Sequence, residues 1–106
     1  LLAGINDDVE TLDRLMRALV TARVKPYYLH HPDLVRGTGH FRVSIQHGQT
    51  LMKALRGRLS GLAQPTYVLD VPGGHGKVPV GPGYFGDDPQ GLLIEDAFGE
   101  RHRYPA

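Results

Sequence analysis

The 106-residue chain contains no cysteine and has almost no net charge, because 12 lysines and arginines offset 11 acidic residues and leave +1. Without thiols, the chain can form neither an internal disulfide nor a thiolate-ligated metal site. Basic residues scattered among acidic ones do not make a nucleic-acid-binding surface. No apolar run approaches the roughly 20 residues that a membrane-spanning helix needs. We therefore expect a cytoplasmic protein that binds neither nucleic acid nor a membrane.

Glycine and proline are abundant, with 14 and 8 residues, and most of the glycines lie in the second half of the chain. The length allows at most one ordinary domain or a piece of a larger one. The first four residues, Leu-Leu-Ala-Gly, are typical of the end of a buried strand that runs into a turn. A strand needs partners, so we expect this chain to be the C-terminal part of a longer protein.

Two amphipathic helices are predicted to alternate with strands. Asn6, Asp7 and Asp8 supply capping oxygens for a first helix, and Ser44 is a suitable N-cap for a second; apolar residues recur at helical spacing after both sites. These apolar residues are Val9, Leu12, Leu15, Met16, Leu19 and Val20 in the first helix, and Ile45, Leu51, Met52, Leu55 and Leu59 in the second. Strands are predicted over residues 24–30 and 66–70. Short links between helix and strand favour an α/β fold with a parallel sheet.

The C-terminal region differs in character from the rest. Residues 78–89 are rich in glycine and proline and are predicted to be irregular or extended. Residues 91–96 and 100–104 are predicted to pair as a β-hairpin around residues 97–99. We therefore divide the chain into βα units over residues 1–80 and a tail over residues 81–106.

The stretch Asp-Val-Pro-Gly-Gly-His-Gly-Lys at residues 70–77 is the first candidate for a functional site. Glycine lets a backbone approach a ligand closely and adopt positive φ angles. We expect Lys77 to be held out on this glycine loop, where it could form a Schiff base or contact a phosphate. A glycine-rich turn with a solvent-exposed lysine is equally compatible with the local sequence.

Ligands of parallel α/β folds bind at the carboxyl ends of the strands. Asp33 follows the first predicted strand and Asp70 ends the second, so their carboxylates are expected to face one pocket. Such a pair could perform acid–base chemistry or bind a cationic group, although an aspartate that merely caps each strand also fits. None of the six histidines forms an i, i+4 helical pair, so no intrinsic metal site is expected.

Several blocks, taken in order, resemble the C-terminal part of the lysine 2,3-aminomutase family from residue 1 to about residue 84. They are Leu-Leu-Ala-Gly-Ile-Asn-Asp-Asp at 1–8, Val-Lys-Pro-Tyr-Tyr-Leu-His-His-Pro-Asp at 24–33, Gly-His-Phe-Arg at 39–42, Leu-Arg-Gly at 55–57, Ser-Gly at 60–61, Pro-Thr-Tyr-Val-Leu-Asp at 65–70 and Pro-Gly-Gly-His-Gly-Lys at 72–77. The order and the separations of these blocks carry the resemblance, since no single block is specific.

The resemblance implies an enzyme that moves the amino group of L-lysine from carbon 2 to carbon 3 by radical chemistry. The cofactors implied are a [4Fe–4S] cluster, S-adenosylmethionine and pyridoxal 5′-phosphate, and the fold implied is a fragment of a partial (β/α) radical-SAM barrel. Lys77 matches the lysine that forms an aldimine with pyridoxal phosphate. Asp33 and Asp70 match the acids that hold the substrate's ε-ammonium. Members that act on glutamate lack this acid pair, so a cationic substrate is implied.

The resemblance also places some of the machinery outside this chain. The C-x-x-x-C-x-x-C cluster motif and the phosphate-binding arginines lie upstream in the family, so we expect this piece alone to be inactive. The expected partners are L-lysine and the remainder of the parent chain, with the whole protein a homo-oligomer. Two alternatives remain open: a proteobacterial-type aminomutase that supplies β-lysine for elongation factor P, and a non-catalytic lysine-binding domain.

Overall fold

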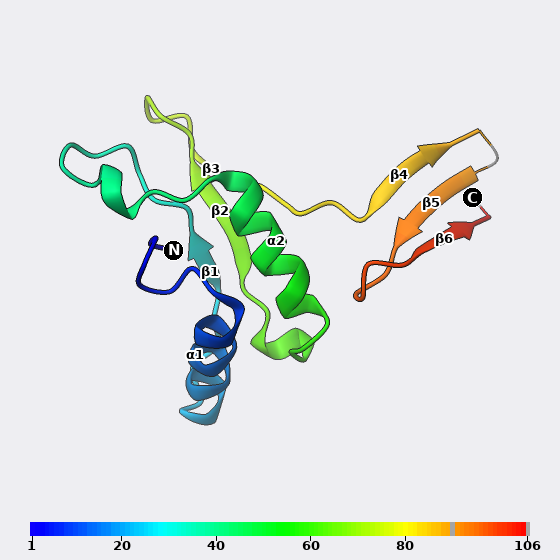
Figure 1. Ribbon diagram of the computed structural model, residues 1–106, viewed down its shortest axis with the longest axis horizontal. Helices are drawn as coiled ribbons and strands as arrows, with labels where there is room; N and C mark the ends of the chain where they lie inside the picture. The colour runs from blue at the N-terminus through cyan, green and yellow to red at the C-terminus, as the bar shows by residue number, and fades with distance from the viewer. Residues whose placement is uncertain (90, 106) are drawn as a thin grey trace.

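A computed structural model describes residues 1–89 and 91–105 of the chain. The fold is α/β, with two helices packed on one small sheet and a second small sheet that projects to one side (Figure 1). The elements are α1 (Val9–Thr21), β1 (Tyr28–His30), η1 (Gly39–Phe41), α2 (Ile45–Arg56), η2 (Gly61–Ala63), β2 (Thr66–Asp70), β3 (Lys77–Pro79), β4 (Phe85–Asp88), β5 (Gly91–Glu95) and β6 (Arg101–Tyr104). No helix in these two ranges is long and apolar enough to cross a bilayer.

The first sheet has the order β1-β2-β3 and confirms the predicted parallel pairing. Strand β1 pairs with β2 so that Leu29 lies opposite Tyr67 and His30 opposite Val68. The strand predicted over residues 24–30 is shorter in the structure, because β2 begins only at Thr66 and leaves the earlier residues without a ladder partner. Residues 3–6 form the predicted turn, but no strand is assigned to the residues before it.

Helix α2 begins at its predicted cap, Ser44, and of the three candidates for the first cap, Asp8 is the one that caps α1. The Asp8 side chain accepts a hydrogen bond from the Thr11 amide at 2.8 Å, and the Ser44 hydroxyl accepts one from the His47 amide at 3.0 Å. The apolar stripe of α1 is wider than the surface that the rest of the protein buries. Leu15 is 42% exposed, whereas Leu12 is fully buried. Periodicity therefore identified the correct face of α1 but not how much of it is covered.

The hydrophobic core joins both helices to the first sheet. Its buried members are Leu12, Met16, Leu29, Leu51, Met52, Leu55, Leu59, Ala63 and Tyr67. The Tyr67 ring, 1% exposed, lies against α2 at Gly48, where a Cβ atom would stand only 2.2 Å from the tyrosine hydroxyl. Glycine disfavours a helix interior by about 1 kcal/mol relative to alanine. The close approach of the ring explains why α2 has a glycine there.

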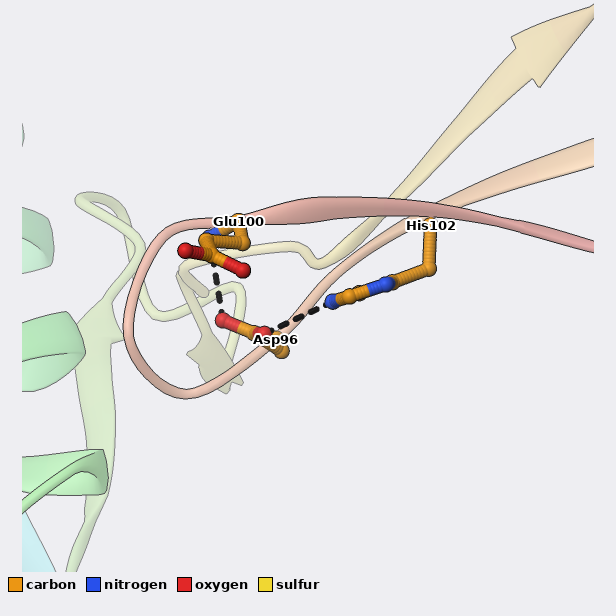
Figure 2. Close-up of side chains that lie close together, drawn as sticks. All are labelled: Asp96, Glu100 and His102. Atoms are coloured by element: carbon orange, nitrogen blue, oxygen red, sulfur yellow. Dashed lines mark hydrogen bonds and ion pairs between the residues drawn. The ribbon is translucent and has the colours of Figure 1, made fainter.

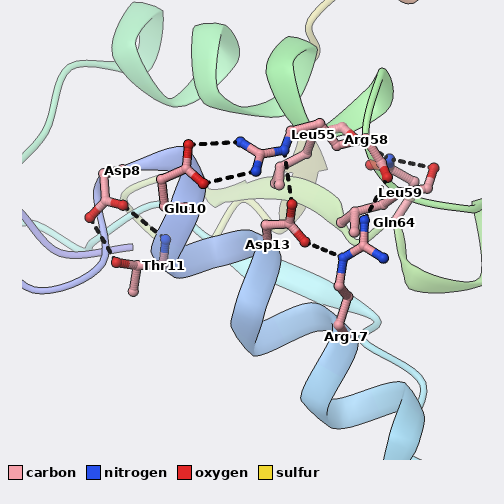
Figure 3. A network of polar contacts seen from close by, with 9 residues as sticks. All are labelled: Asp8, Glu10, Thr11, Asp13, Arg17, Leu55, Arg58, Leu59 and Gln64. Atoms are coloured by element: carbon pink, nitrogen blue, oxygen red, sulfur yellow. Dashed lines mark hydrogen bonds and ion pairs between the residues drawn. The ribbon is translucent and has the colours of Figure 1, made fainter.

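A network of charged side chains ties the start of α1 to the segment after α2 (Figure 3). Arg58 donates to both carboxylate oxygens of Glu10, at 3.1 and 2.8 Å, and its Nε lies 2.8 Å from the carboxylate of Asp13. Arg17 also donates to Asp13, which is buried. Arg58 lowers the pKa of Glu10, and Arg17, with a smaller contribution from Arg58, lowers the pKa of Asp13.

The second sheet is an antiparallel meander of β4, β5 and β6. The predicted hairpin of β5 and β6 is confirmed, and the stretch predicted to be irregular or extended holds most of β3 and all of β4. Contact with α2 runs through Lys53, whose Nζ lies 2.6 Å from the Glu95 carboxylate and 5.8 Å from the centre of the Tyr84 ring. A Cβ at Gly57 would also meet the Phe98 ring at 3.3 Å. The meander is therefore anchored at the C-terminal end of α2.

Replacing Gly48 with alanine should destabilise the protein by about 1–3 kcal/mol, although alanine favours helix formation, because the new methyl group overlaps the Tyr67 ring. The measurement is the free energy of unfolding in urea. Gly61→Ala is the control, since a Cβ there meets nothing within 4 Å. An unchanged stability for Gly48→Ala would contradict this account of the packing.

The Arg58 network should make stability fall in acid. The folded-state pKa values of Glu10 and Asp13 lie below their ordinary 4.5 and 3.8, so the network stabilises the fold above these values and loses that contribution as the pH falls through the lowered ones. The stability difference between wild type and Arg58→Met should therefore shrink as the pH falls below about 5. Urea unfolding at a series of pH values, with Arg101→Met as the control, measures this difference. A difference independent of pH would disprove it.

Candidate functional site

The carboxyl ends of β1 and β2 lie side by side, because the two strands are parallel neighbours. Asp33 lies three residues after β1, and Asp70 is the last residue of β2. Both line one open groove of about 490 Å³, together with Leu34, Val71, Pro72, Gly73, Gly74 and Gly76. The structure thus places the two predicted acids on the wall of one groove, while their roles stay a prediction.

The glycine loop is the turn of a β-hairpin. The Val71 amide donates to the Gly76 carbonyl at 2.8 Å, and Gly73, Gly74 and Gly76 all have positive φ, between +74° and +96°. These backbone angles reverse the chain, so that β3 returns antiparallel to β2.

The predicted position of Lys77 on the loop itself is wrong. Lys77 is the first residue of β3 and stands directly opposite Asp70. Its Nζ lies 2.6 Å from the Asp70 Oδ1. This ion pair was not predicted from the sequence. The available signal was an acid at the end of a strand and a lysine just after a glycine-rich turn, because a hairpin brings two such residues opposite each other.

Two carboxylates, those of Asp33 and Asp70, line the groove, and the ammonium group of Lys77 lies beside it through its contact with Asp70. The side chains of Lys77 and Asp70 are 33% and 45% exposed, so their ion pair adds at most about 1 kcal/mol to stability. Asp33 is exposed on the neighbouring wall. The set combines a primary amine, a group able to attack carbonyl carbon, with two acids able to bind a cation.

A histidine–tyrosine pair ties the segment before Asp33 to β2. The His31 Nδ1 lies 2.6 Å from the Tyr67 hydroxyl, and the His31 amide donates to the Val68 carbonyl at 2.8 Å. Burial lowers the pKa of His31 and raises that of Tyr67 to about 12, so the phenol is neutral at physiological pH. Sequence analysis assigned no role to His31. Its adjacency to His30 at a strand end was the available signal.

A second group of polar side chains lies at the turn between β5 and β6, with one of its members on β6 itself (Figure 2). Within residues 1–89 and 91–105, one group of three side chains could hold a metal ion, with ligand atoms within 4.8 Å of one another: Asp96, Glu100 and His102. The Asp96 carboxylate accepts hydrogen bonds from the Phe98 and Glu100 amides, both at 2.9 Å, and contacts the His102 Nε2 at 2.7 Å. His102 and these amides lower the pKa of Asp96. Both Asp96 oxygens therefore serve to close the turn.

Comparison with known proteins connects this chain to one family. A family model described as Lysine-2,3-aminomutase matches residues 52–92. The L-lysine 2,3-aminomutase of Bacillus subtilis strain 168 is 43% identical over 105 residues, or 98% of this chain and 22% of that protein. The L-lysine 2,3-aminomutase of Fusobacterium nucleatum is 50% identical over 84 residues, or 79% of this chain and 20% of that protein.

A relative named for a different substrate is nearly as similar. The glutamate 2,3-aminomutase of Clostridioides difficile strain 630 is 45% identical over 84 residues, or 79% of this chain and 20% of that protein. The chain spans about a fifth to a quarter of the length of the curated relatives it matches. The identity to the glutamate enzyme lies between those to the two lysine enzymes, 43% and 50%.

Replacing Tyr67 with phenylalanine should lower the free energy of unfolding by about 1–3 kcal/mol, because the ring stays packed at Gly48 while the His31 Nδ1 loses its partner. Urea unfolding measures the change. Tyr104→Phe, at a residue that is 57% exposed on β6, is the matched control and should be neutral. Equal stability of the two variants would show that the histidine–tyrosine bond contributes nothing.

Proposed function

Because the chain belongs to the lysine 2,3-aminomutase family, as a C-terminal part of it, we propose that the full-length protein is an isomerase that converts L-lysine to β-lysine. The amino group moves from carbon 2 to carbon 3. The observation that carries this proposal is that Asp33 and Asp70 line one groove and that Lys77 forms an ion pair with Asp70 at its edge. The names of the relatives favour this function over a non-catalytic lysine-binding domain.

The two acids support lysine rather than glutamate as the substrate. Asp33 and Asp70 line the same groove, so the side-chain ammonium of lysine would be attracted by two carboxylates. A glutamate side chain would meet two like charges there, which disfavours its binding. The acids thus provide both the attraction for one substrate and the repulsion against the other.

The residues of this groove fit the attachment of pyridoxal phosphate. Lys77 presents a primary amine next to the groove, and a Cβ at Gly74 or Gly76 would meet nothing within 4 Å, so a ligand can approach the loop backbone closely. When bound, the cofactor supplies an aldehyde and a conjugated ring that stabilises charge or an unpaired electron at the substrate. Lys77 would hold it, and Asp33 and Asp70 would orient the far end of the substrate.

The residues of this chain do not fit an iron–sulfur cluster, since there is no cysteine to ligate one. We propose that the cluster and S-adenosylmethionine are held by the remainder of the parent protein. The β1–α2–β2 unit would then be one unit of a partial (β/α) radical-SAM barrel. We further propose that the full-length protein is cytoplasmic and homo-oligomeric.

The test uses the full-length protein, reconstituted without oxygen with iron, sulfide, pyridoxal phosphate and S-adenosylmethionine. L-lysine should be converted to β-lysine by the wild type, and Lys77→Ala should abolish conversion. Asp33→Asn and Asp70→Asn should each lower kcat/KM at least about tenfold, because each loses a charge-assisted hydrogen bond. Lys53→Met, which removes a lysine from an equally short ion pair away from the groove, is the control.

Two results would contradict the proposal. One is the absence of conversion by a wild-type protein that holds all three cofactors. The other is conversion of L-glutamate in preference to L-lysine, which would assign the acids a role other than binding the substrate ammonium.

A further inference from the structure

The backbone itself brings Asp70 and Lys77 together. The two residues are directly opposite in the β2–β3 ladder, and the hydrogen bond from the Val71 amide to the Gly76 carbonyl closes the loop between them. Opposed residues on antiparallel strands have Cβ atoms about 5 Å apart, well within the reach of a lysine to an aspartate. In the described ranges of the chain, each is the ion-pair partner of the other, at 2.6 Å.

This pairing leaves the groove with unequal acids. The Asp70 carboxylate is already neutralised by Lys77, whereas Asp33, on the neighbouring wall, is exposed. An incoming ammonium group therefore meets one available carboxylate rather than two. Lys77, proposed to hold the cofactor, and Asp70, proposed to hold the substrate, form an ion pair with each other. Neither is available for its proposed role until this ion pair opens.

We propose that Asp70 binds two ammonium groups in succession: that of Lys77 before the cofactor is attached, and that of the substrate side chain afterwards. This inference rests on the proposed function of Lys77 and Asp70. Attachment of the cofactor would thereby complete the cation-binding pair of acids. The order of events follows from the ion pair: cofactor first, lysine second.

The covalent step requires the ion pair to open. An ammonium nitrogen has no lone pair, so Lys77 must first release a proton to solvent. Its Nζ then bonds to the aldehyde carbon of the cofactor, and the two remaining Nζ hydrogens leave with the aldehyde oxygen as water, so that C=N replaces C=O. Asp70 has then lost its partner. Because the ion pair is partly exposed and therefore weak, the need to open it slows cofactor attachment only slightly.

Two measurements on the full-length protein test this exchange. The first is the rate at which pyridoxal phosphate attaches to Lys77, followed by absorbance and confirmed by borohydride reduction and peptide mass. Asp70→Asn should accelerate attachment, by up to about fivefold for an exposed pair. Asp33→Asn, which removes the same charge from the same groove, should leave the rate unchanged, as should Glu95→Gln at the Lys53 ion pair.

The second measurement is the affinity of the cofactor-loaded protein for L-lysine, by calorimetry. Asp70→Asn and Asp33→Asn should both weaken the affinity for L-lysine. Asp70→Asn is therefore the variant expected to attach the cofactor faster and yet bind L-lysine more weakly. Attachment at the wild-type rate or slower in Asp70→Asn would overturn the exchange while leaving the proposed function intact. Failure of the wild type to attach the cofactor at Lys77 would instead overturn the proposed function.

Discussion

The burial of the Tyr67 ring is the constraint on which the rest of the structure depends. The ring fills the space left by Gly48 in α2, and its hydroxyl reaches His31 beyond the end of β1. Leu29 is its register partner and joins it in the same core. One side chain thus fixes the helix, the strand and the segment that leads to Asp33. Both walls of the groove depend on that packing.

Features encoded by neighbouring residues could be predicted from the sequence. Asp8 and Ser44 each cap a helix through an amide three residues away, so short-range chemistry placed the start of α2 at Ser44 and that of α1 within residues 6–8. The parallel pairing followed from short links between strands and helices. The length of β1 could not be predicted, because a strand extends only as far as its partner does. The exposure of Leu15 depends in the same way on what covers α1.

The candidate site was predictable only in part. Parallel strands bring their carboxyl ends to one edge, and this rule placed Asp33 and Asp70 at one groove. Glycine and proline signal a turn without specifying which residues pair across it, and for that reason β3 and the Asp70–Lys77 contact were missed. The His31–Tyr67 bond joins residues far apart in the chain and exists only once the core has formed.

The groove is assembled from one local and one distant contact, and these form at different stages of folding. Asp70 and Lys77 meet when the hairpin loop of residues 71–76 closes, a microsecond-scale event for a typical hairpin. Asp33 joins them only when β1 pairs with β2 across the whole of α2, which carries a larger loop-closure entropy. We therefore expect the acid–amine pair to form before the second acid arrives. A defect in the crossover helix would separate the two acids and still leave the lysine with its partner.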